Sequence, residues 1–171
     1  MKSKLKIWSI WDFVLKDKNG KILKKWTERN LCPNEFLNDA LGVVFDSGTQ
    51  KTAWYMVLFE NNHTPAAGDT YAVPGYTECT AYDEVNRPTV NFAVPATQSI
   101  TNSANQAVFT MNATRTIYGA AIVAGGTAAD TKGDVAGGGV LGPVSQFTGG
   151  AESVIATNVL NVTVTVSVAD T

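Results

Sequence analysis

Hydrophobic positions in the first thirty residues fall into two short runs separated by a turn, a pattern that is typical of paired β-strands. Lys6 to Lys16 is rich in Ile, Trp, Phe and Val, and Lys21 to Thr27 follows as a return strand. The link between them, Asp17-Lys18-Asn19-Gly20, contains an Asn-Gly step, which is the strongest short-range hairpin signal. The pattern therefore predicts an N-terminal β-hairpin.

The next segment changes to helical spacing. Pro33 suits the first position of a helix, and Glu35 and Asp39 are favourable near its positive end. Apolar residues then recur three and four positions apart, at Phe36, Leu37, Ala40, Leu41 and Val44. We expect one short amphipathic helix over residues 33–44, and no other substantial helix.

The remainder of the chain is dominated by β patterns. Ala53 to Glu60 is a continuous apolar run and predicts a central core strand. Nearby prolines place shorter strands at Thr77–Tyr82 and Thr89–Val94 on sheet edges. Ala107–Met111 predicts a further strand, as does Thr116–Ala124, in which Gly119 marks a bulge or a close backbone approach.

Two features complete the pattern at the C-terminal end. Ten of the fifteen glycines lie between Gly119 and Gly150, and residues 125–150 therefore predict an extended, mobile or partner-ordered loop. Valines alternate with polar residues from Val162 to Val168, which predicts a strand with one apolar face.

Length and pattern together predict one domain over residues 1–171. A chain of 171 residues buries enough surface to fold without disulfides or metal, and neither an internal repeat nor a linker divides it. Short strands with one early helix indicate a mainly β fold, a β-sandwich or jelly roll that begins with the hairpin of residues 1–29.

Charge is unevenly distributed along the chain. Residues 1–29 hold nine basic and three acidic residues, a net charge of +6, whereas the remaining residues sum to −8. Such asymmetry favours contact with an oppositely charged partner or with another copy of the chain. The alternative is that the lysines only protect the exposed face of an edge strand. Charged residues make up only 16% of the chain, which suits a protein in a crowded assembly.

The hairpin supplies the candidate partner-contact residues, which are Lys2, Lys4, Lys6, Trp8 and Trp11. Lysines suit an acidic surface, and tryptophans are effective interface anchors. An alternative for Trp8, Trp11 and Trp26 is that they anchor the hairpin to a core.

Catalytic chemistry is not indicated by any motif. The single histidine, His63, sits in a polar loop, where a solvated side chain is the expected state. Glu78, Asp83 and Glu84 form one acidic cluster, which we interpret as a loop held by a salt bridge to Arg87. We therefore expect no enzyme and no catalytic residues.

Cofactor, nucleic-acid and membrane sites are not indicated either. Asp130 to Asp134 lacks the acidic density of a calcium loop, and the glycine runs lack the features of a phosphate-binding loop. Cys32 and Cys79 have no metal-ligand spacing and are expected as buried free thiols. We expect no metal, no cofactor, no nucleic-acid partner, no membrane span, and synthesis in a cytoplasm without a signal peptide.

The order of short motifs resembles a known family. These motifs are Asp17 to Gly20, Asn30-Leu31-x-Pro33-Asn34-x-Phe36-Leu37, Trp54-Tyr55-x-x-Leu58-Phe59, Glu78-x-x-x-Tyr82-x-Glu84-x-x-Arg87-Pro88 and Ile117-Tyr118-Gly119-Ala120. With the glycine-rich loop and the valine-rich last strand, they resemble small virion proteins of tailed bacteriophages, most closely the capsid decoration or cement proteins of short-tailed phages.

The resemblance implies a jelly-roll-like β-sandwich that forms a homotrimer on the capsid exterior and bridges major capsid protein subunits. The lysine-rich beginning departs from the pattern of that family. Two alternatives remain, a tail or receptor-binding component of the same kind of particle, and a glycan-binding β-sandwich module. In the first of these, Trp54, Tyr76 and Tyr82 are candidate glycan contacts.

Overall fold

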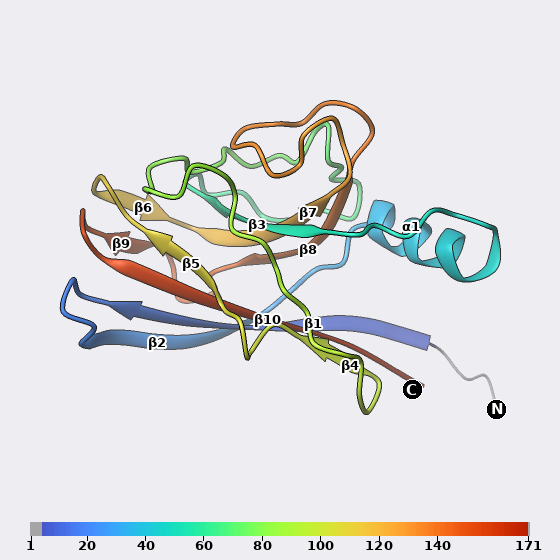
Figure 1. The fold of residues 1–171 in the computed structure, drawn as a ribbon, viewed down its shortest axis with the longest axis horizontal. Coiled ribbons are helices and arrows are strands. Elements are labelled where there is room, and N and C mark those ends of the chain that lie inside the picture. The colour runs from blue at the N-terminus through green and yellow to red at the C-terminus, as the bar shows by residue number, and fades with distance from the viewer. Residues whose placement is uncertain (1–4, 171) are drawn as a thin grey trace.

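The computed structural model describes residues 5–170, which contain ten strands and one helix (Figure 1). In chain order these elements are β1 (Leu5–Lys16), β2 (Ile22–Arg29), α1 (Asn34–Phe45), β3 (Trp54–Phe59), β4 (Ser99–Thr101), β5 (Ala107–Thr110), β6 (Arg115–Ile117), β7 (Gly119–Ala124), β8 (Val140–Gln146), β9 (Glu152–Val154) and β10 (Val159–Asp170). The prediction of a mainly β chain with one short helix is confirmed.

The larger sheet joins the two ends of the chain. Its strand order is β2-β1-β10-β4, and β5 pairs with the first part of β10. β1 and β10 run antiparallel over their full lengths, from Leu5 opposite Asp170 to Lys16 opposite Val159. The hairpin prediction is confirmed: Gly20 closes the turn with a φ of +82°, and an Asp17 carboxylate oxygen accepts the N–H groups of Asn19 and Lys21.

The smaller sheet has the order β3-β7-β8, and β6 and β9 form a separate two-stranded piece. The predicted strand over Thr116–Ala124 is interrupted at Tyr118, because β6 and β7 pair in different sheets. The prediction for Gly119 is confirmed, since a Cβ there would lie 2.2 Å from both the Phe59 ring and the Ser145 carbonyl oxygen.

The main core lies between the two sheets. Trp11, Phe13, Val162 and Val164 come from the larger sheet, and Met56, Leu58, Ala120 and Ile122 from the smaller one. Every second residue of β1 and of the first half of β10 points inward, as the alternating sequence pattern predicts. The molecule is therefore built on two antiparallel sheets that pack face to face.

A second apolar cluster covers the other face of the smaller sheet. Val57, Phe59, Val123 and Leu141 pack there against Tyr71 and Ala129, which come from long loops. These loops form the upper layer of Figure 1. The pieces predicted as strands at Thr77–Tyr82 and Thr89–Val94 are irregular, with pairing limited to single bridges such as Phe59 with Glu78, and they contribute Tyr82 and Val90 to the main core.

The prediction that residues 125–150 form one glycine-rich loop is wrong for its second half. Val140–Gln146 is β8, whose first six residues are all buried. Gly142 is required within it, because a Cβ would lie 2.6 Å from the Ile122 side chain. The pairing with β7 shifts between Ala121 and Val123, which lets the strand accommodate Pro143. Only the parts before and after β8, residues 125–139 and 147–150, remain loops.

The helix begins and ends within one residue of its predicted limits. Pro33 precedes α1, and the Glu35 carboxylate accepts the Tyr71 N–H at 2.8 Å and the Leu141 N–H at 2.6 Å. Phe36 meets Trp54 edge-to-face at 6.0 Å. The first turn is thus tied to the smaller sheet, while Phe45 at the other end is 80% exposed. Over residues 5–170, no helix has the length and apolar character needed to cross a membrane.

Candidate functional site

The candidate partner-contact residues separate onto different faces of β1. Lys6 is exposed and Trp8 is partly buried, and both lie on the face of the sheet turned away from the core. Trp11 points the other way and is fully buried, with its indole N–H donating to Ser9 Oγ at 2.6 Å. Trp11 is therefore a core residue in this fold, as the alternative interpretation predicts. Lys2 and Lys4 lie outside the described residues.

A hollow of about 430 Å³ lies beside Lys6 and Trp8. Ser9, Ile10, Arg29 and Asn30 complete its lining. Within residues 5–170, none of the ion pairs includes Lys6 or Arg29. The hollow therefore combines an aromatic side chain with two cationic groups whose charge is not neutralised by an ion pair within the described part of the chain.

The pairing between β1 and β2 ends beside this hollow. β2 pairs with β1 only from Ile10 to Lys16. The Ser9 N–H instead donates a hydrogen bond to Asn30 Oδ1, at 2.6 Å. The chain then leaves the larger sheet, because Leu31 pairs with Val144 of β8 through hydrogen bonds of 3.1 and 3.0 Å. The first residues of β1 have β10 on one side and no described strand on the other.

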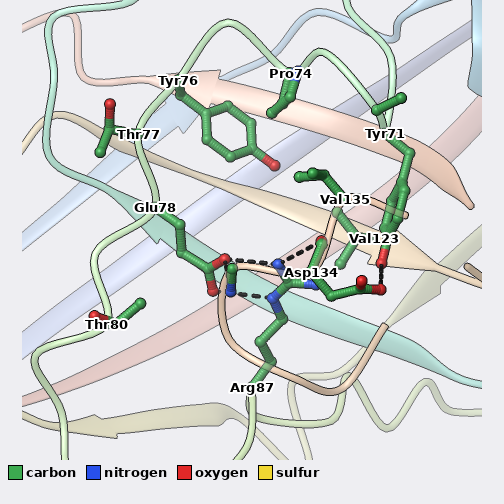
Figure 2. A pocket seen from close by; sticks show the side chains of 12 residues that line it. Tyr71, Pro74, Tyr76, Thr77, Glu78, Thr80, Arg87, Val123, Asp134 and Val135 are labelled. Carbon is green, nitrogen blue, oxygen red and sulfur yellow. Dashed lines mark hydrogen bonds and ion pairs between the residues drawn. The ribbon is translucent and has the colours of Figure 1, made fainter. Parts of the chain in front are cut away.

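A second concave site lies among the loops that cover the smaller sheet (Figure 2). Its volume is about 420 Å³. Tyr76, Pro74 and Val135 contribute apolar walls, and Figure 2 shows the Tyr76 hydroxyl directed into the space between them. Tyr76 is itself held by stacking on Phe59, with the ring centroids 5.1 Å apart. Of the three aromatic side chains predicted as glycan contacts, Trp54, Tyr76 and Tyr82, only Tyr76 lines this site.

Arg87 organises the floor of this pocket. Its guanidinium donates two hydrogen bonds to the Glu78 carboxylate, at 2.9 and 2.6 Å, and others to the backbone carbonyls of Ala129 and Asp134. Burial alone would lower the Arg87 pKa, but the hydrogen bonds and charge of Glu78 raise it above its usual value. The predicted salt bridge between the acidic cluster and Arg87 is confirmed for Glu78.

Asp134 and Tyr71 close one side of the pocket. The Tyr71 hydroxyl donates to the Asp134 carboxylate at 2.7 Å. Burial, together with that neighbouring carboxylate, raises the pKa of Tyr71 to about 12, and the tyrosine hydrogen bond lowers the pKa of Asp134. Glu78 and Asp134 outnumber Arg87, so the pocket carries a net negative charge and favours neutral or cationic ligands that donate hydrogen bonds.

The other aromatic candidates are occupied elsewhere. Tyr82 is 1% exposed and meets Phe109 edge-to-face, and the Lys132 ammonium lies 3.7 Å from its ring centroid. Trp54 is in contact with Phe36 of the helix.

The single histidine has a structural contact. The prediction of a solvated His63 is wrong, because its side chain is only 17% exposed and its Nε2 lies 2.7 Å from the Asp69 carboxylate.

Free thiols are confirmed for both cysteines, although only Cys79 is fully buried and Cys32 is half-buried. Burial raises the pKa of each thiol. Among residues 5–170, no three His, Cys, Asp or Glu side chains gather closely enough to hold a metal ion. In residues 130–134, compared above with a calcium loop, the Asp130 carboxylate accepts a hydrogen bond from the Asn86 side chain, and the Asp134 carboxylate accepts one from the Tyr71 hydroxyl.

Sequence reasoning missed Arg29 and Asn30 at the hairpin, and Tyr71 and Asp134 at the loop pocket. In the sequence, Arg29 is only one of the nine basic residues of the first 29 positions. The helix signal after Asn30 showed that the strand ends there, but it gave no indication of which strand the chain would pair with next. The contact between Tyr71 and Asp134 joins positions 63 residues apart, and no local pattern encodes it.

A scan against protein-family models and a search of curated proteins return no match.

Proposed function

We propose that this chain is a non-enzymatic virion structural protein, a capsid decoration or cement protein that bridges major capsid protein subunits on the outside of the head. In this proposal the two facing sheets are the jelly-roll-like β-sandwich implied by the motif resemblance, and the protein acts as a homotrimer. The resemblance of the motifs between Asp17 and Ala120 supports the assignment to a virion.

The observation that carries the proposal is the basic outer surface of the hairpin. Lys6, Lys25 and Arg29 are exposed there, and none of them takes part in an ion pair within residues 5–170. Cations that leave their counter-charge to another molecule suit attachment to an acidic protein surface. The partly exposed Trp8 beside them supplies an anchor that lysines alone do not provide.

Attachment is tested with the triple variant Lys2→Gln, Lys4→Gln, Lys6→Gln added to particles that lack the protein. We expect lower occupancy than wild type at low salt and convergence at high salt, because salt screens exposed charges over about 10 Å at 0.1 M. The measurement is bound protein per particle across a salt series, with Lys51→Gln, in the loop before β3, as a control away from the hairpin. Equal binding of wild type and triple variant at every salt concentration would leave the lysines as a solubility device.

A glycan-binding module is the second candidate function, and the pocket of Figure 2 favours it. A volume of about 420 Å³, a tyrosine ring and two carboxylates form a site that suits sugar hydroxyls. A glycan array on the wild-type chain, repeated with Tyr76→Ala, distinguishes it from attachment by the hairpin. Hits that disappear in the variant support glycan binding, and an empty array removes this candidate.

A further inference from the structure

We propose that the open edge of β1, from Leu5 to Ser9, receives an extended acidic segment of a partner protein as an additional antiparallel or parallel strand. The inference deepens the proposed function, because it rests on an acidic partner and names the form in which that partner binds. Strand addition obtains its affinity from main-chain hydrogen bonds and its specificity from pockets for alternate side chains. This edge offers both main-chain hydrogen-bonding groups and hollows for side chains.

The backbone orientation follows from Ser9. Backbone groups of successive strand residues point to opposite sides, and the Ser9 N–H points toward Asn30, on the side of β2. The N–H and C=O groups of Ile7 therefore point to that side as well, and so do those of Leu5. A continued register would have placed Cys32 opposite Ile7, but the chain has already turned to Val144 at Leu31. The departure of the chain leaves this stretch of β1 without a second neighbouring strand among residues 5–170.

A hollow lies on each face of the larger sheet beside this stretch of β1. On the outer face is the space of about 430 Å³ beside Lys6, Trp8 and Arg29. On the inner face is an apolar groove of about 260 Å³ that runs from Ile7 across β10 to Ile100 of β4, with Phe36 of the helix also in its lining. The inner face of the larger sheet extends here beyond the smaller sheet, as Figure 1 shows for the ends of β1 and β10 near α1.

These two hollows specify the pattern of the bound segment. Side chains of an added strand alternate between the two faces of the sheet. Those on the outer face meet Lys6 and Arg29 and are expected to be Asp or Glu, whereas those on the inner face meet Ile7 and Phe36 and are expected to be aliphatic. The preferred partner segment is therefore one in which acidic and apolar residues alternate.

A second copy of the same edge is a poorer occupant. Pairing two copies through Leu5–Ser9 would bring two Lys6 and two Arg29 side chains to one small interface. Like charges on neighbouring strands destabilise the pair. The unneutralised positive charge of the edge instead complements an acidic segment, and this complementarity selects the partner.

The experiment uses the full-length chain and a blocked hexapeptide in which Glu and Val alternate, acetyl-Glu-Val-Glu-Val-Glu-Val-amide, followed by backbone amide NMR. We expect saturable shifts centred on Leu5 to Ser9. The variant Ile7→Pro removes the outward N–H, and its own pairing with β10 is maintained by the backbone of Lys6 and Trp8. It should bind the peptide at least about fivefold more weakly, the loss expected for about one hydrogen bond. Ile7→Val retains the N–H and should bind like wild type.

Two further comparisons keep the result independent of any folding defect in the proline variant. A peptide of the same composition in blocks, acetyl-Glu-Glu-Glu-Val-Val-Val-amide, should bind more weakly to wild type because it cannot satisfy both hollows. The charge-reversed variant Lys6→Glu, Arg29→Glu should prefer the alternating peptide in which Lys replaces each Glu. Shifts that map away from β1, or equal binding of the alternating and block peptides, would overturn the inference. A dimer that forms without peptide and is abolished by Ile7→Pro would overturn it too, in favour of a second copy.

The inference and the proposed function fail in different ways. Peptide binding at β1 by a chain that does not attach to particles supports the strand-addition site and removes the capsid role. Attachment to particles that is unchanged by Ile7→Pro supports the capsid role and removes strand addition as its mechanism.

Discussion

Arg87 joins three segments of the loop layer through a side chain that is only 2% exposed. It contacts Glu78 through its paired donors, and it reaches the carbonyls of Ala129 and Asp134 in the glycine-rich segment. Because that segment has few side chains of its own, hydrogen bonds from Arg87 replace the apolar packing that would otherwise hold it. The residue converts an expected mobile loop into a wall of the pocket.

Removal of Arg87 is predicted to be costly. Arg87→Met leaves the Glu78 carboxylate buried without its counter-charge, which typically destabilises a protein by about 3–5 kcal/mol. The double variant Glu78→Gln, Arg87→Met should be more stable than the single one, because no uncompensated charge remains. Unfolding free energies from urea titrations check both statements. A single variant that loses less than about 1 kcal/mol would show that the ion pair is not buried as described.

The hydrogen bond from Tyr71 to Asp134 predicts a specific pH dependence. Tyr71→Phe should destabilise the chain by about 1.5–3 kcal/mol near neutral pH, the range for a hydrogen bond to a charged group. The Tyr71 pKa is raised to about 12, so its contribution is complete below the unfolded value of about 10 and is lost as the pH rises toward 12. The Asp134 pKa is lowered, so its contribution is present above the ordinary carboxylate pKa and is lost as the pH falls.

The stability difference between wild type and Tyr71→Phe should therefore be largest at neutral pH and shrink toward both extremes. Urea unfolding across a pH series measures this, with Tyr118→Phe as the control, since Tyr118 packs against the same apolar cluster. A difference that stays constant from acid to alkaline pH would contradict the assignment of this hydrogen bond.

Among the secondary-structure elements, β7 depends most on a glycine. A Cβ on Gly119 would lie 2.2 Å from both Phe59 and the Ser145 carbonyl, whereas a Cβ on Gly42 of α1 would meet no atom within 4 Å. Gly119→Ala is predicted to cost at least about 1–3 kcal/mol through overpacking. Gly42→Ala is predicted to stabilise by about 0.5–1 kcal/mol through helix propensity. Thermal unfolding of the two variants tests the pair, and equal effects would be inconsistent with the packing around β7.

Local sequence patterns were sufficient to predict some elements and not others. The hairpin, the helix and β10 follow from Asn19-Gly20, the spacing after Pro33 and the alternating valines, which are signals contained within each segment. β8 was missed because Gly142 and Pro143 are unfavourable in a regular strand, and only contact with Ile122 and the shift in pairing with β7 explain them.

The candidate site was predictable to a similar extent. Composition identified Lys6 and Trp8 on the hairpin, but it left Trp11 open between a core anchor and a partner contact, because β1 is rich in apolar residues on both faces. The open edge was not predictable at all. It exists because Leu31 pairs with Val144, a residue more than a hundred positions away that belongs to the missed strand.

At the scale of the whole molecule, the basic and acidic features lie on opposite sides of the two sheets. The hairpin surface forms the lower side of Figure 1, and the loop layer that contains Glu78 and Asp134 forms the upper side. Under the proposed function, an orientation with the hairpin toward an acidic capsid surface turns the loop pocket outward. The positive edge would then face the shell, and the negatively charged pocket would face the surrounding medium.

The location of the protein on the particle tests the capsid role most directly. Cryo-electron microscopy of particles with and without this chain should show density on the outside of the head, in contact with neighbouring major capsid subunits, that disappears when the chain is absent. Within that density, the β1–β2 hairpin should face the shell. Difference density at the tail, or heads that are identical with and without the chain, would contradict the account.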